Sequence, residues 1–190
     1  MRPTRAELET FRDAEVEDLL PSPLRLLFVG INPSPWTAAV GAHFARPGNR
    51  FYPALAAAGI LPRVLDASAG YDAADRALLQ DAGIGVSNLV RRATARAEEL
   101  SAVELREGAE RLARDVARWR PAVVAVLGVT AYRQGFARPR AVVGRQPEDL
   151  AGSPLWVVPN PSGLNAHETT ASLAAAYAEP ARAAGVLRPR

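Results

Sequence analysis

The chain has 190 residues, of which 48% are hydrophobic, a size and composition that fit one globular domain with a sizeable core. It contains no Cys, which excludes disulfides, thiolate nucleophiles and Cys-ligated zinc or iron–sulfur sites. All 23 basic residues are Arg, so a P-loop and Schiff-base chemistry through a Lys side chain are also excluded, while the net charge of +3 weakly favours a polyanionic partner.

The N-terminal segment mixes Arg with Glu and Asp and has no apolar signal core, and no apolar run approaches the ~18 residues of a membrane span. We therefore expect a cytoplasmic protein without a membrane segment. Apolar residues at helical spacing predict a helix over Thr4–Leu20, which ends at Pro21-Ser22-Pro23. We assign residues 1–22 to an N-terminal helical extension and residues 1–190 to a single domain.

Strand and helix signals then alternate along the chain. Short apolar runs bounded by breakers predict four strands, at Leu24–Ile31, Ile84–Val90, Val123–Leu127 and Leu155–Val158. Helical spacing and capping residues predict five helices, at Asn49–Ala58, Asp72–Ala82, Ser101–Trp119, Thr130–Phe136 and Thr169–Ala184. This alternation predicts an α/β fold, a three-layer αβα sandwich with a central, mostly parallel sheet of four or five strands.

Two further segments have expected conformations. The Pro- and Gly-rich stretch from Asn32 to Asn49 is expected to be a long loop, and loops of that length inside a compact domain are usually functional. In the helix predicted over Ser101–Trp119, the i,i+4 pairs Glu107/Arg111 and Glu110/Arg114 favour a solvated, self-paired face over a docking surface.

Two polar turns follow the first and the last predicted strand. Gly30-Ile31-Asn32-Pro33 leaves the first, and Asn160-Pro161-Ser162-Gly163-Leu164 follows the last. Because the carboxyl ends of parallel strands share one sheet edge, where ligands bind, we expect these turns to converge. Asn32 is the first candidate for chemistry, and the alternative is that its side chain caps its own turn. Leu164 is either exposed at the tip of its loop or packed into the core.

These two loops resemble the signature motifs of the mismatch-specific uracil/thymine DNA glycosylases, the Mug and thymine-DNA glycosylase branch of the uracil-DNA glycosylase superfamily. Between them, the segment from Phe44 to Tyr52 is similar to the Phe-Ala-x-Pro-x-Asn-Arg-Phe motif of that family. The resemblance spans about Val16 to Tyr177. Asn32 and Asn160 stand where the highly active uracil-DNA glycosylases have Asp and His, which indicates the mismatch-specific branch.

The resemblance implies a monofunctional base-excision repair glycosylase that flips uracil out of G·U mismatches in double-stranded DNA and leaves an abasic site. Thymine and other damaged pyrimidines are further candidate bases. It implies no cofactor and no metal, and we expect a monomer. By the same resemblance, Asn32 positions the attacking water and Phe44 stacks on the base, while Leu164 enters the base stack. The remaining implied contacts are Gly30, Ile31 and Asn160 with the base, and Ser162 and Gly163 with the DNA.

Some positions and functions stay open. Trp36 could reshape the pocket near position 5 of the pyrimidine, Asn88 could contact the base or cap its strand, and Asn165-Ala166 stands where Mug has Ser-Arg. One alternative function is the same fold acting on hypoxanthine, xanthine or ethenocytosine. The others are a catalytically silent DNA- or nucleotide-binding module, and a metal-dependent hydrolase that uses the two His residues, His43 and His167.

Overall fold

The computed structural model describes residues 3–187, and a five-stranded sheet runs through the centre of the molecule. The strands are β1 (Leu26–Gly30), β2 (Ile84–Asn88), β3 (Val123–Leu127), β4 (Gly144–Arg145) and β5 (Leu155–Val158). They lie in the order β2-β1-β3-β5-β4, in which β4 pairs antiparallel with β5 and every other neighbouring pair is parallel. The predicted mostly parallel sheet of four or five strands is confirmed.

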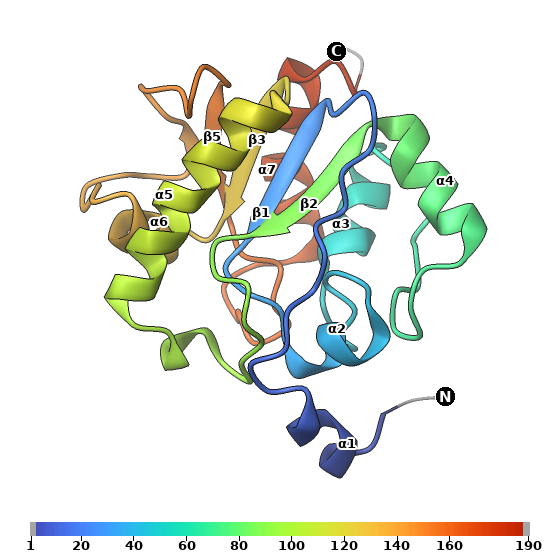
Figure 1. Ribbon diagram of the computed structural model, residues 1–190. Coiled ribbons are helices and arrows are strands. Elements are labelled where there is room, and N and C mark those ends of the chain that lie inside the picture. Colours follow the sequence, from blue (N-terminus) through green and yellow to red (C-terminus); the bar gives the residue numbers. More distant parts are fainter. Residues whose placement is uncertain (1–2, 188–190) are drawn as a thin grey trace.

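Helices cover both faces of the sheet, and Figure 1 shows α5 in front of it and α7 behind. The helices are α1 (Arg5–Thr10), α2 (Pro35–Val40), α3 (Phe51–Ala57), α4 (Ala73–Ala82), α5 (Ala102–Trp119), α6 (Val129–Gly135) and α7 (Thr170–Ala183), with a 3₁₀ turn η1 (Ala97–Glu99) before α5. Leu26 and Phe28 of β1 belong to the core on the α3 and α7 side, whereas Leu27 and Val29 belong to the core under α5 and α6. Such alternation is expected of a strand buried on both faces, and it confirms the three-layer αβα architecture.

Capping residues fix where α4 and α5 begin. The Ser101 hydroxyl accepts a hydrogen bond from the Glu104 N–H at 3.2 Å, and the Glu104 carboxylate accepts one from the Ser101 N–H at 2.9 Å. This is a capping box, which satisfies two amide groups that would otherwise stay unpaired at the start of the helix. The Asp72 carboxylate caps α4 by accepting the Asp75 N–H at 2.7 Å, and Gly83 ends that helix in the left-handed conformation with φ of 68°.

The pairing predicted for Arg111 with Glu107 is wrong. Arg111 forms its ion pair with Asp115, at 2.8 Å, and donates two hydrogen bonds to the main-chain oxygens of Asn88 and Leu89. Both Glu107 and Asp115 lie one helical turn from Arg111, so spacing alone does not choose between them. The main-chain oxygens of Asn88 and Leu89 bind the Arg111 guanidinium on the side toward the sheet, and these hydrogen bonds connect α5 to the end of β2.

The helix predicted over Thr4–Leu20 is also wrong for most of its length, since α1 ends at Thr10. Beyond it, Leu19 forms an antiparallel bridge with Val86, with main-chain hydrogen bonds of 2.8 and 2.9 Å. Because β2 lies at the edge of the sheet, its free amide and carbonyl groups bind the extended segment in place of a further helical turn.

Two short elements, α2 and β4, were not predicted. The stretch from Asn32 to Asn49 contains α2, in which Ser34 is the N-cap, Pro35 the first helical residue and Gly41 the left-handed C-cap. Pro35 and Gly41 therefore mark the two helix ends, which is a common use of both residue types. The two residues of β4, Gly144 and Arg145, lie outside the four predicted strands. No helix in residues 3–187 has the length and apolar character needed to cross a membrane.

Candidate active site

A cavity of about 320 Å³ opens at the carboxyl-terminal edge of the parallel strands. The residues after β1, β2 and β5 contribute to its wall, together with Leu127 at the end of β3, as the predicted convergence of strand-end loops requires. Seven of the predicted site residues line it, namely Gly30, Ile31, Asn32, Phe44, Asn160, Ser162 and Leu164. Gly163 does not line the cavity but lies against Gly48, where an added Cβ would meet the Gly48 oxygen at 2.6 Å.

The Asn32 side chain is fixed by hydrogen bonds across the cavity. Its amide nitrogen donates to the main-chain oxygen of Arg92 at 3.1 Å and to the Thr94 hydroxyl at 2.7 Å. A main-chain oxygen only accepts, so the amide nitrogen has to face this loop and both of its hydrogens are used. The Asn32 carbonyl oxygen is left to accept a hydrogen bond from a molecule in the cavity. These bonds run to another loop, and the cap of the following helix is Ser34, so the turn-capping alternative for Asn32 is wrong.

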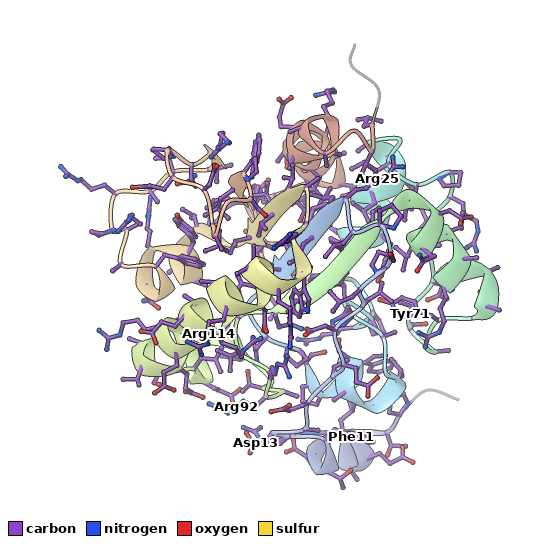
Figure 2. The ribbon with its side chains drawn as sticks, turned by 45° about the horizontal axis from the view of Figure 1, so that its top comes forward. Phe11, Asp13, Arg25, Tyr71, Arg92 and Arg114 are labelled. Atoms are coloured by element: carbon purple, nitrogen blue, oxygen red, sulfur yellow. The ribbon has the colours of Figure 1, made fainter. Side chains whose placement is uncertain are left out.

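The loop that holds Asn32 is itself anchored by Arg92. The Arg92 guanidinium donates to the Glu104 carboxylate at 2.5 Å, to the Asp13 carboxylate at 2.9 Å and to the Glu99 main-chain oxygen at 3.1 Å. Figure 2 shows Arg92 beside Asp13 of the N-terminal segment. Hydrogen bonds from Arg92 and from Ser101 lower the pKa of Glu104 to about 2, so this carboxylate is charged at neutral pH.

Thr94 and Arg92 were not among the predicted site residues. They follow the strand predicted over Ile84–Val90, whereas the predicted convergence involved only the turns after the first and last strands. The rule that every parallel strand delivers a loop to the same edge applies equally to this strand. For this strand the rule predicts that residues 91–96 lie at the site, and this segment supplies both hydrogen-bond acceptors for the Asn32 amide nitrogen.

His43 and Asn88 form the buried end of the cavity, and both are at most 5% exposed. His43 Nε2 lies 2.9 Å from the Glu17 main-chain oxygen and therefore donates its hydrogen. His43 Nδ1 is then the acceptor, and it receives the Asn88 amide nitrogen at 3.4 Å. Burial lowers the pKa of His43, which keeps the ring neutral in this arrangement. At Gly30 a Cβ would lie 2.6 Å from the Asn88 amide oxygen, so only glycine allows this approach.

Phe44 lies at the cavity wall in a strained conformation, with φ of 55°. Its ring packs at 4.1 Å between centroids on Phe51, which is fully buried, whereas Phe44 is only partly buried. The backbone before it is held by two tyrosines, since Tyr52 donates to the His43 oxygen at 3.1 Å and Tyr71 accepts from the His43 N–H at 3.0 Å. Phe44 therefore presents an aromatic surface to the cavity, whereas Phe51 and Tyr52 are buried in the core.

Trp36 and Leu164 lie differently with respect to the cavity. The Trp36 indole donates to the Ser68 main-chain oxygen at 3.0 Å and is not part of the cavity wall, so it does not reshape the pocket. Leu164 is 67% exposed at the tip of the loop after β5, so the core alternative for it is wrong. Within residues 3–187, no three His, Cys, Asp or Glu side chains lie close enough together to hold a metal ion.

The comparison with known families agrees with this geometry. The family model described as the uracil DNA glycosylase superfamily matches residues 17–181, which include the whole sheet, both Asn-containing loops and every residue of the cavity wall. The chain therefore belongs to the uracil DNA glycosylase superfamily, whose members are DNA N-glycosylases that remove damaged bases.

Proposed function

We propose that the chain is a mismatch-specific glycosylase of the Mug and thymine-DNA glycosylase branch, which removes uracil from G·U pairs in double-stranded DNA. The observation that carries this proposal is Asn32, whose amide nitrogen is occupied by Arg92 and Thr94 and whose amide oxygen is left for a water in the cavity. An Asp at this position could accept a proton from the water or place a full negative charge in the cavity, whereas an amide only orients the water.

A base can reach the cavity only after it has left the DNA double helix. Flipping a nucleotide breaks its stacking and pairing at a cost of a few kcal/mol, and the cost is least for a mispaired base. Phe44 offers the flipped base an aromatic face, and base–aromatic stacking contributes about 1–3 kcal/mol. Leu164, exposed at the rim, is the side chain suited to fill the space that the base leaves in the stack.

In the hydrolytic step the C1′–N1 bond breaks and its electron pair stays on the uracil. The oxygen of the Asn32-bound water forms a bond with C1′, and the water proton passes to the uracil anion, since an amide takes up no proton near neutral pH. The main-chain groups of Ile31 and Phe44 at the cavity wall are the candidates for stabilising the negative charge on the leaving base. Because the water is oriented and not deprotonated, we expect slow turnover and a strong dependence on the leaving group.

A single-turnover excision panel tests the proposal. The substrates are U·G, T·G and U·A duplexes, single-stranded uracil, and duplexes with hypoxanthine, xanthine or ethenocytosine. We expect the fastest release from U·G, and an abasic product that breaks only on treatment with alkali, since no Lys amine is present to cleave the strand. Faster release of another lesion would reassign the substrate, and no release from any duplex would contradict the proposal. The cytoplasmic location, the monomeric state and the single domain over residues 1–190 stay predictions from the sequence.

A further inference from the structure

One arginine lies beneath the whole loop that carries Leu164. The main-chain N–H of Arg50 donates to the Pro161 oxygen at 3.0 Å. The guanidinium of the same residue donates to the main-chain oxygens of Ser162 at 2.7 Å and Asn165 at 2.6 Å, and also to that of Glu168. Four carbonyl groups of the loop after β5 therefore converge on a single residue at the start of α3.

The charge of Arg50 is not neutralised by a carboxylate. Among the residues that the structure describes, Arg92 pairs with Asp13 and Glu104, whereas Arg50 forms no ion pair. Its Nε is buried and also lacks a hydrogen-bond partner. The loop oxygens are thus the principal partners of this cation, and charge-assisted hydrogen bonds of this kind are stronger than neutral ones.

The loop has few other connections to the body of the protein. Gly163 packs against the Gly48 main chain, and the Tyr177 hydroxyl donates to the Pro159 oxygen at 3.0 Å, where the loop begins. The remaining hydrogen bonds of Asn160 and Ser162 are internal to the loop. The loop therefore has a defined local shape, but its position relative to the cavity depends on Arg50 and its neighbours in the Phe44–Arg50 segment.

We propose that Arg50 is a positioning residue that fixes this loop so that Leu164 enters the base stack, and that it thereby sets the preference for duplex over single-stranded substrate. The proposal rests on the proposed function. A wedge opens a stack only if the loop behind it does not yield. The planar fork of Arg reaches several diverging carbonyls at once, whereas the ammonium group of Lys is a single point of charge.

Single-turnover excision by Arg50→Met and Arg50→Lys tests this inference. For Arg50→Met we expect about a tenfold loss on the U·G duplex and a loss below about twofold on single-stranded uracil, because only the duplex needs a wedge. Arg50→Lys keeps the positive charge but lacks the planar guanidinium group. We expect it to lose most of the duplex activity that Arg50→Met loses. The matched control is Arg118→Met, which removes one charge from an exposed side chain near the end of α5. Equal losses on both substrates would overturn the proposal.

A double-mutant cycle separates positioning from a general loss of stability. If Arg50 acts through Leu164, the Arg50→Met/Leu164→Ala double variant should be about as active on the duplex as the less active of the two single variants. Additive losses of duplex activity would contradict the proposal. Should Arg50→Met fail to fold, Arg50→Lys takes its place in the cycle. A 2-aminopurine beside the mispair reports opening of the stack independently of excision. A wild-type protein that opens the stack without releasing uracil would refute the proposed function and leave this inference testable by fluorescence.

Discussion

The loops after β1 and β5 contain the same three residues in the same order, yet the structure uses them differently. Asn32-Pro33-Ser34 and Asn160-Pro161-Ser162 both leave the carboxyl-terminal edge of the sheet. The Asn160 amide oxygen accepts the Ser162 N–H at 2.9 Å and so caps its own turn, whereas the Asn32 amide nitrogen reaches across the cavity to Arg92 and Thr94.

The residue after each triplet accounts for part of the difference. After the first triplet Pro35 begins α2, so Ser34 becomes a helix cap. After the second triplet Gly163 continues an irregular loop, with the exposed Leu164 at its tip. The first loop therefore leaves one amide oxygen free in a rigid wall, and the second offers an apolar tip. We interpret the first as the chemical half of the site and the second as the half that engages DNA.

The largest effect is expected from Asn32→Ala, compared with Asn160→Ala. Loss of the group that orients the water should lower single-turnover excision from U·G by at least about 100-fold, within the range seen for positioned catalytic groups. The Asn160→Ala variant should lose far less, since it loosens a turn. Thermal unfolding should show that both variants fold. Equal losses in the two variants would remove the distinction between the loops.

The next largest effect is expected from Leu164→Ala. Without the wedge, excision from the U·G duplex should fall about tenfold, whereas excision from single-stranded uracil should hardly change, because no stack has to be opened. Parallel rate measurements on the two substrates check this, with Val103→Ala, another exposed apolar side chain, as the matched control. A loss of similar size on both substrates would argue against a role for Leu164 in opening the duplex.

A smaller effect is expected from Arg92→Met, which releases the loop that holds Asn32. Relaxed positioning of a reacting group costs rate, and we expect roughly a fivefold lower kcat with KM for duplex DNA unchanged. Steady-state kinetics on U·G substrate separate the two parameters. If KM rises and kcat is retained, Arg92 contacts DNA and does not act through Asn32.

The smallest effect concerns the two histidines, one beside each half of the site. His43 is buried and its pKa is lowered by that burial, whereas His167 is exposed on the loop after β5. A lowered pKa means that the unfolded chain binds a proton that the folded protein does not, so stability falls as the pH drops below the ordinary His value of about 6.5. Urea unfolding at pH 8 and pH 5 should show this fall in the wild-type protein. The fall should be smaller in His43→Gln, and His167→Gln, changed at an exposed site, is the control. A wild-type protein equally stable at both pH values would contradict it.

Much of the fold was predicted from local sequence. Val123–Leu127 and Leu155–Val158 were predicted with the bounds that β3 and β5 have, because continuous apolar runs between breakers have few other interpretations. The Ser101/Glu104 capping box located the start of α5, and Asp72 and Gly83 located the two ends of α4, for the same local reason. The two-residue β4 and the extended segment that reaches Leu19 were missed, because both exist only through pairing with a strand that is remote in the sequence.

The sequence by itself determined that two Asn-containing turns share one edge of a parallel sheet, and that Cys and Lys chemistry are absent from the site. Only the tertiary structure decided which Asn caps its own turn and which is held by Arg92 and Thr94. It also decided that Arg50 lies under the loop of Leu164. The physical reason is that each of these side chains has several hydrogen-bond partners within reach in principle, and the packing of distant segments selects among them.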